Sequence, residues 1–357
     1  MKPDWDKSKE RFDAWWHGEA VDRVLLQVTA PKRGLDGISH LPMPDTPEAR
    51  WLDIDYRIAA LERQMEQTYY GGDAFPCLFT NMGAGIISNI LGCPAEFRHD
   101  TVWCHPCLGE IAAAELPSGD ENNRYWKWVQ EFARTGAEHF RGRAMVGFPD
   151  LIGGLDLLAQ LLGNEKLLWA LADEGQHVHR LQSGTSDAFL RYYDPIYQII
   201  KDETGGSSWG CFDTYGAGRM AVVQCDFSGM ISAAMFEEYC VPYLAEVCER
   251  VDQAVYHLDG SCALQHVDPL LTIDSLAAIQ WTPGTGSLPP ATDESWIPLY
   301  RQIRAAGKAV MVRGGYARDV HKLVEELGPE GLDIAIYVAS QDEAEELVRQ
   351  SFSWKKA

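Results

Sequence analysis

The 357-residue sequence contains no apolar run of the roughly 18 to 20 residues that a membrane-spanning helix requires. Its N-terminal segment is charged and aromatic and lacks the apolar core of a secretory signal peptide. Basic residues are also scarce, because 31 Lys and Arg stand against 52 Asp and Glu, which gives a formal net charge of −21. Binding to nucleic acids or anionic membranes requires clustered basic side chains, so this composition argues against both. We expect a soluble, cytoplasmic protein that acts on a small molecule.

The nine cysteines are an odd number in a long chain, which favours reduced thiols over a disulfide framework. The string Trp-Cys-His-Pro-Cys at 103–107 matches the active-site motif of thioredoxin-like oxidoreductases. In that fold a helix begins at the first cysteine, here Cys104, and lowers its pKa. The residues after Cys107 instead predict a strand or loop, and no second Cys-x-x-Cys completes a metal site. We therefore interpret the match as accidental, and the role of Cys104 and Cys107 stays open.

Short apolar segments alternate with amphipathic helical segments along the chain. The apolar segments have the length and composition of buried strands. They lie at residues 24–31, 75–79, 143–148, 220–225, 254–258, 276–281, 308–313 and 332–338. This alternation predicts a parallel sheet covered by helices, and the number of strands favours an α/β fold of the (β/α)8 TIM-barrel type.

The predicted barrel is a single domain over residues 1–357, with a helical extension at 5–17 and insertions at 82–142 and 153–203. No shift in composition marks a linker, and no internal repeat or low-complexity segment is present. A doubly wound open sheet is the alternative architecture. It is disfavoured because no Gly-x-Gly-x-x-Gly follows the first strand.

In a barrel, catalytic residues gather where the strands end and the following loops begin. This rule selects a set of candidate site residues. They are Asn81, Asp150, Asp226, Ser228, His257, Asp259, Gln280, Trp281 and Arg313. We expect Asp226, His257 and Asp259 to be catalytic and the other six to bind the substrate.

His257 and Asp259 are two residues apart, so on a strand both side chains point to the same face. Such a pair can hold a divalent metal ion, or act as a general acid or base with its orienting partner. Alternatively, His257 is a hydrogen-bonded residue inside the barrel and Asp259 caps the turn at Gly260.

Structural roles also compete with functional ones at other candidates. Asp226 and Ser228 are suited to cap a helix that begins near Ser232. Arg313 can clamp an anionic substrate, since its planar fork matches a carboxylate or phosphate, or it can pair with an acidic neighbour. For His266, a core or surface position is favoured over a catalytic one.

Two stretches resemble the uroporphyrinogen decarboxylase superfamily. They are FSGMISAAMFEEYCVPYL at 227–244 and YHLDGSCALQHVDPLLTIDSLAAIQWTPGTG at 256–286. The stronger similarity covers residues 220–350, and a weaker one covers RAMVGFPDLIGGLDLLAQLLGNEKLL at 143–168. The superfamily has the (β/α)8 fold and includes the decarboxylase and the methylcobalamin:coenzyme M methyltransferases.

The departures from the family patterns bear on which branch the chain resembles. Uroporphyrinogen decarboxylases carry Arg-Gln-Ala-Gly-Arg-Tyr after the first strand, whereas VTAPKRGLDG here keeps only Lys32 and Arg33 as basic residues. The methyltransferase branch holds zinc with a His-x-Cys pair after the fifth strand and a Cys after the eighth. Here the pair is His257-x-Asp259, and YVASQDEAEEL after the last strand has no cysteine. The third zinc ligand is therefore not identified.

The resemblance thus implies a methyltransferase that moves a methyl group between a separate corrinoid-binding protein and a small-molecule donor or acceptor. It implies zinc at His257 and Asp259, and a methyl-corrinoid that the partner supplies. A decarboxylase or other lyase acting on a small carboxylate or tetrapyrrole is the alternative, with Arg313 gripping the carboxylate. A non-catalytic binder of tetrapyrrole or corrinoid is the third. The sequence defines neither the substrate nor the oligomeric state, for which a homodimer is one option.

Overall fold

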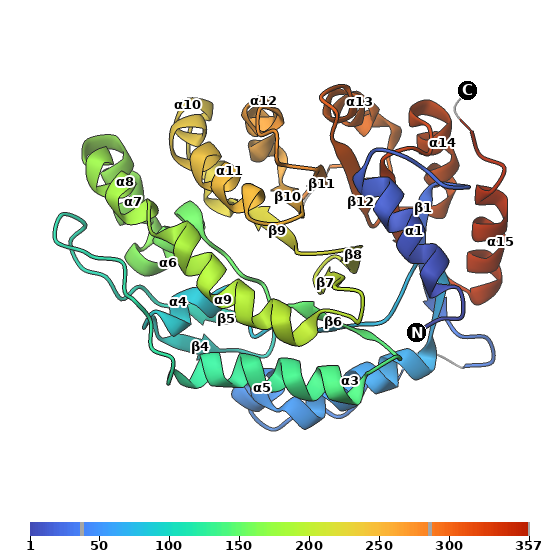
Figure 1. Ribbon diagram of the computed structural model, residues 1–357, viewed down its shortest axis with the longest axis horizontal. Helices are drawn as coiled ribbons and strands as arrows, with labels where there is room; N and C mark the ends of the chain where they lie inside the picture. The colour runs from blue at the N-terminus through green and yellow to red at the C-terminus, as the bar shows by residue number, and fades with distance from the viewer. Residues whose placement is uncertain (36–38, 285–287, 356–357) are drawn as a thin grey trace.

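The computed structural model describes residues 1–35, 39–284 and 288–355 and has a mixed α/β architecture with two main sheets (Figure 1). The larger sheet is seven-stranded, in the order β2-β1-β13-β12-β11-β10-β9. Its strands are β1 (Leu25–Pro31), β2 (Thr68–Gly72), β9 (Met220–Gln224), β10 (Gln253–Asp259), β11 (Ala278–Thr282), β12 (Ala309–Arg313) and β13 (Leu332–Tyr337). All neighbours pair in parallel except β2, which is antiparallel to β1.

The smaller sheet has four strands in the order β3-β6-β7-β8. These are β3 (Cys77–Phe79), β6 (Met145–Phe148), β7 (Ser207–Trp209) and β8 (Thr214–Gly216), and only β8 is antiparallel to its neighbour. Strands β4 (Ala95–Phe97) and β5 (Val102–Cys104) form a separate antiparallel pair.

Each of the strand segments expected from the sequence contains a strand, namely β1, β3, β6, β9, β10, β11, β12 and β13. The parallel strands of the larger sheet follow chain order from β9 to β13 and then β1, as in a barrel wall and unlike a doubly wound sheet. The structure therefore confirms a parallel α/β sheet.

Among the described residues, the two sheets are not joined into a closed barrel by a continuous ladder of hydrogen bonds. On one side, β2 leads directly into β3 through residues 73–76. On the other side, the Ser207 hydroxyl of β7 donates to the Gly218 carbonyl (2.7 Å) and accepts from the Met220 amide of β9 (3.3 Å). Closure between the sheets thus depends here on side chains and connecting segments.

Helices cover the outer faces of both sheets. Figure 1 shows α10 to α15, in gold to red, along the larger sheet, and α3, α5 and α9 beside the smaller one. The helices are α1 (Trp5–Trp16), α2 (Pro47–Leu52), α3 (Ile54–Gln67), α4 (Ile86–Ile90), α5 (Arg124–His139), α6 (Gly154–Leu162), α7 (Asn164–Asp173), α8 (Gly175–Gln182), α9 (Thr185–Ile200), α10 (Ala233–Met235), α11 (Val241–Glu249), α12 (Val267–Leu271), α13 (Ile297–Ala305), α14 (Ala317–Leu327) and α15 (Gln341–Ser351). Short irregular helices are η1 (Asp226–Met230), η2 (Phe236–Cys240), η3 (Ser261–His266) and η4 (Glu294–Trp296). No helix in the described ranges has the length and apolarity needed to cross a bilayer.

The helical extension predicted at the start of the chain is α1, which packs across both sheets (Figure 1). Its buried Trp15 donates from Nε1 to the carbonyl of Val310, near the start of β12 (3.2 Å). Trp16 donates from Nε1 to the carbonyl of Tyr215 on β8 (2.8 Å). Helix α1 therefore ties the two sheets together near the amino ends of the parallel strands, away from the carboxyl edge where the candidate residues lie.

Candidate metal centre

Three of the sequence candidates meet at the carboxyl ends of the neighbouring strands β9 and β10. Asp226 begins η1, two residues after β9, while His257 and Asp259 lie at the end of β10. One ligand atom from each side chain lies within 4.8 Å of the others, an arrangement found for no other such group in the part of the chain that the structure describes. The group combines one imidazole with two carboxylates, so Asp226 occupies the position of the third ligand that the sequence left unidentified.

The imidazole of His257 is oriented by the neighbouring strand β11. His257 and Gln280 are register partners, and the Nδ1–H of His257 donates to the side-chain oxygen of Gln280. Gln280 in turn donates from Nε2 to the hydroxyl of Thr282 (2.9 Å), which leaves its oxygen to face the histidine. Because the proton is on Nδ1, the lone pair of Nε2 is available to a ligand, as in histidines that bind metals.

The turn that carries Asp226 is held by a residue that the sequence analysis missed. The two carboxylate oxygens of Asp156, in the first turn of α6, accept from the backbone amides of Asp226 and Phe227, each at 2.8 Å. Burial, followed by the charge of Asp226, raises the pKa of Asp156 to about 7. Asp156 thus positions the Asp226 turn, and it lies 70 residues away in a segment where the sequence indicated only a helix.

Carboxyl groups crowd around His257. Burial raises the pKa of Asp150 to about 6, and the charge of Asp226 raises it further. The pKa of Asp226 is also raised, mainly by burial and then by the charge of Asp259. His257 opposes both shifts by its charge. A bound cation would relieve the repulsion among these carboxylates, so the electrostatics favour one.

Several of the expected substrate-binding residues lie around this group, with roles that the structure defines. Asn81 accepts from the backbone amide of Asp150 through Oδ1 (3.4 Å), so the two residues lie together. Gln280 orients His257, as described above. Ser228 is buried within η1, and its carbonyl accepts from Nε2 of His266 (2.9 Å), so it supports the turn. His266 is itself fully buried, which confirms the favoured core position.

The structure corrects the expectation for Trp281. Side chains alternate along β11, and Trp281 lies on the opposite face from Gln280. Its ring is fully buried and packs against Trp296 at a centroid distance of 4.9 Å. Trp281 therefore belongs to the packing between the sheet and its helices, not to the substrate pocket.

Arg313 pairs with an acidic neighbour, the second of the two options that the sequence left open. Its Nη2 lies 2.6 Å from a carboxylate oxygen of Asp333, which is fully buried on β13. Its Nε donates to the carbonyl of Phe212 (2.9 Å), and the Phe212 ring lies 5.1 Å from the ring of His257. Arg313 thus holds the segment beneath His257, and its guanidinium is occupied by protein groups.

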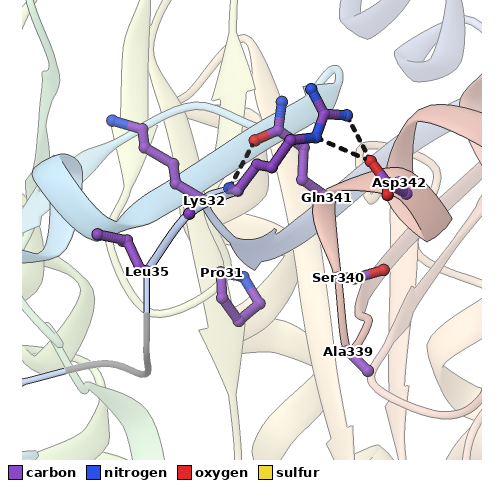
Figure 2. A pocket seen from close by; sticks show the side chains of 9 residues that line it. Pro31, Lys32, Leu35, Ala339, Ser340, Gln341 and Asp342 are labelled. Atoms are coloured by element: carbon purple, nitrogen blue, oxygen red, sulfur yellow. Dashed lines mark hydrogen bonds and ion pairs between the residues drawn. The ribbon is translucent and has the colours of Figure 1, made fainter.

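Two cavities open at the carboxyl edge. One, of about 300 Å³, lies beside Asp226 and is lined also by Asp156, Phe227 and Met230. The other, of about 190 Å³, lies at the ends of β1 and β13 (Figure 2). In the second cavity the backbone amide of Arg33 donates to Gln341 (3.0 Å), and its guanidinium pairs with Asp342 and Glu345. The basic residues after the first strand are therefore engaged, and Asp36 and Gly37 of that stretch lie outside the described residues.

Comparison with known proteins gives one informative match. No protein-family model and no curated protein sequence matches the chain. Among solved structures, a methyltransferase from Methanosarcina mazei is similar with a TM-score of 0.63, over 97% of this chain and 98% of that one, at 10% sequence identity. The two proteins thus share a fold along their full lengths, while membership of the uroporphyrinogen decarboxylase superfamily stays a prediction.

Proposed function

We propose that this protein is a metal-dependent methyltransferase that moves a methyl group between a corrinoid-binding protein and a small molecule. The Asp226–His257–Asp259 group carries the proposal, because it provides a compact ligand set at the carboxyl edge of the strands. The shared fold with a solved methyltransferase supports the reaction class. The resemblance to the methylcobalamin methyltransferases adds the corrinoid partner and the (β/α)8 topology.

The side chains in this group suit a divalent metal ion. Nε2 of His257 and one oxygen from each of Asp226 and Asp259 provide three protein ligands, the number that catalytic zinc sites use while leaving a position for substrate. Two carboxylates also balance the charge of a divalent cation, and the absence of thiolate makes the set harder than a zinc–thiolate centre. We propose zinc, with Asp226 as the third ligand. When bound, such a cation would lower the pKa of an acceptor thiol or hydroxyl.

The neighbouring residues supply positioning and proton transfer. Asp150, whose pKa is raised to about 6, is close to neutrality and suited to take a proton from an acceptor or return one to a leaving group. Asn81 fixes the backbone of Asp150, and Asp156 fixes the turn of Asp226. The cavity beside Asp226, with Phe227 and Met230 in its lining, offers apolar surface to a methylated small molecule.

The decarboxylase alternative is less well supported. It requires Arg313 to grip a substrate carboxylate, and this guanidinium already pairs with the buried Asp333 and with a backbone carbonyl. A substrate would have to displace these partners. Non-catalytic binding of a corrinoid remains as the outcome that the assay below distinguishes.

The first experiment measures the metal content of protein purified without chelators. We expect about one zinc ion per chain in the wild type and loss of that metal in the His257→Ala/Asp259→Ala variant. The matched control is His99→Ala/Asp100→Ala, which removes the same residue types from an exposed site. Metal in neither the wild type nor the control would overturn the metal centre.

The second experiment follows the absorbance of methyl-corrinoid with a panel of thiols and of O- and N-methylated donors. Demethylation or remethylation of the corrinoid that depends on His257 would support methyl transfer. Spectral shifts without turnover would indicate a corrinoid binder, and no change with any compound would overturn the corrinoid link.

A further inference from the structure

A group of three cysteines lies outside the candidate metal centre, around the β4–β5 hairpin. Cys93 follows α4, Cys104 ends β5, and Cys107 lies three residues further on. The sulfur of Cys93 is 3.1 Å from that of Cys107, and the Cys93 thiol is also hydrogen-bonded to the sulfur of Cys104. Cys93 is therefore a common neighbour of both cysteines in the Trp-Cys-His-Pro-Cys string. The absence of a helix after Cys107 still excludes a thioredoxin-like site, but the third cysteine gives the string a partner.

Backbone contacts hold the three cysteines in place. Because β4 and β5 pair antiparallel, Cys104 stands beside the residues that directly follow Cys93. The side chain of Asn89 donates to the carbonyl of Cys93 (3.0 Å). The amide of Cys107 donates to the carbonyl of Leu161 on α6 (3.0 Å). The cluster thus joins a hairpin, a helix and a loop at fixed positions.

The three thiols differ in exposure and in acidity. Cys107 is exposed, Cys104 is half-buried, and Cys93 is 2% exposed. The Cys93 thiol, followed by the hydroxyl of Ser88 at 3.1 Å, lowers the pKa of Cys104 to about 7. Sharing its proton with Cys104, together with burial, raises the pKa of Cys93. Cys104 is thus the thiol that ionises first, with a protonated cysteine next to it.

The arrangement is unlike a metal site. Over residues 1–35, 39–284 and 288–355, these three sulfurs are not among the groups whose ligand atoms lie mutually within 4.8 Å. They form a chain with Cys93 in the middle. Sulfur exchange requires that a thiolate approach one sulfur of a disulfide while the other sulfur leaves, and a central sulfur between two neighbours meets that requirement.

We propose that Cys93, Cys104 and Cys107 form a thiol–disulfide exchange site that is oxidised by a low-molecular-weight disulfide and ends as a Cys93–Cys107 disulfide. This activity is separate from the proposed methyl transfer, and neither depends on the other.

The proposed sequence consists of three exchanges. The Cys104 thiolate attacks the small disulfide, forms a mixed disulfide and releases one thiolate, which takes the proton of Cys93. The Cys93 thiolate then attacks the sulfur of Cys104, forms a Cys93–Cys104 bond and releases the second small thiolate, which takes the proton of Cys107. Finally, Cys107 attacks Cys93 and displaces the Cys104 thiolate. The protein loses two thiol protons and two electrons, and the small disulfide is reduced to two thiols.

The Cys93–Cys107 bond is the expected end point because the thiolate that leaves last is the most stable one. A thiol of lower pKa is the better leaving group, and the hydrogen bonds from Ser88 and Asn89 stabilise the Cys104 thiolate. The 3.1 Å approach of Cys93 to Cys107 requires only a small movement to close the bond.

The test treats the reduced full-length protein with oxidised glutathione, alkylates the remaining thiols and maps the peptides by mass spectrometry. We expect a Cys93–Cys107 cross-link with Cys104 left free. In Cys93→Ser, one glutathione should accumulate on Cys104, because the thiol that resolves the mixed disulfide is missing. In Cys104→Ser, cross-linking at neutral pH should slow by about threefold or more, given the smaller thiolate fraction of an ordinary cysteine. Cys262→Ser, at an exposed cysteine outside the cluster, is the matched control and should react as the wild type does.

The pH dependence of the wild type provides a measurement that needs no variant. The rate of glutathione addition to Cys104 should rise through a midpoint near pH 7. The proposal is overturned if no cross-link within the cluster forms in excess oxidised glutathione, or if Cys104→Ser reacts as fast as the wild type. It is also overturned if a metal ion co-purifies with the protein and is lost in Cys93→Ser.

Discussion

His257 and Gln280 are register partners on adjacent parallel strands, and the side-chain oxygen of Gln280 accepts the Nδ1 proton of His257. This one contact decides which nitrogen of the imidazole can meet a ligand. It also explains why Gln280 is fully buried although it is polar: both ends of its amide are satisfied, by His257 and by Thr282. The candidate metal centre therefore rests on three neighbouring strands, β9, β10 and β11.

The first prediction concerns Gln280. Replacing it by Ala removes the acceptor that fixes the imidazole, so metal affinity should fall by about 10- to 100-fold, as for other residues that support metal-binding histidines. Gln280→Glu keeps an acceptor at the same place and should retain most of the affinity. Titration with zinc against a competing chelator measures both. Wild-type affinity in Gln280→Ala would mean that His257 does not bind metal through Nε2.

The second prediction concerns Asp156. In Asp156→Asn only one side-chain oxygen remains to accept the amides of Asp226 and Phe227, so the turn should loosen. We expect faster amide hydrogen exchange at both residues and metal affinity lower by about tenfold. Glu165→Gln, an exposed acid in the first turn of the next helix, is the control and should change neither. Unchanged exchange at Asp226 would show that the turn is held by other contacts.

The third prediction is a pH dependence of stability in the metal-free protein. Burial raises the pKa of Asp150 to about 6 in the folded state, whereas an unfolded Asp has a pKa of about 3.9. Protonation therefore stabilises the fold, fully below about pH 4, and this stabilisation is lost as the pH rises through 6. Asp150→Asn removes the penalty, so at pH 7.5 the variant should be more stable than the wild type by about 1–3 kcal/mol.

Urea unfolding at several pH values, with a chelator present, checks this expectation. The difference in unfolding free energy between wild type and variant should shrink toward zero below about pH 4. A difference that is constant with pH would show that Asp150 keeps an ordinary pKa in the fold.

Much of the architecture could be predicted because long apolar strands and amphipathic helices have strong periodic patterns. The strands that were missed lack that pattern. Ser207–Trp209 is short and polar, and Thr68–Gly72 directly continues a helical segment. Their pairing is set by neighbours distant in the sequence, which local composition does not encode.

The site shows the same division. The carboxyl ends of parallel strands share one edge, so the rule of strand ends brought Asp226, His257 and Asp259 together. Asp156 could not be found in this way, since its partners lie across the fold in η1. Trp281 was avoidable: once Gln280 is placed on the inner face, strand alternation turns Trp281 outward.

The last prediction separates the two interpretations of Arg313. If it is a structural partner of Asp333, then Arg313→Met leaves a carboxyl group buried without its counter-charge, and the fold should lose about 3–5 kcal/mol. Adding Asp333→Asn should restore most of that loss, because the uncompensated charge is removed as well. Arg349→Met breaks an exposed pair with Glu346 and, as the control, should cost under about 1 kcal/mol. Urea unfolding of the four proteins measures these differences. If Arg313→Met instead kept wild-type stability and weakened only the binding of small carboxylates, the clamp would be real, and the decarboxylase hypothesis would regain the residue that the ion pair now takes from it.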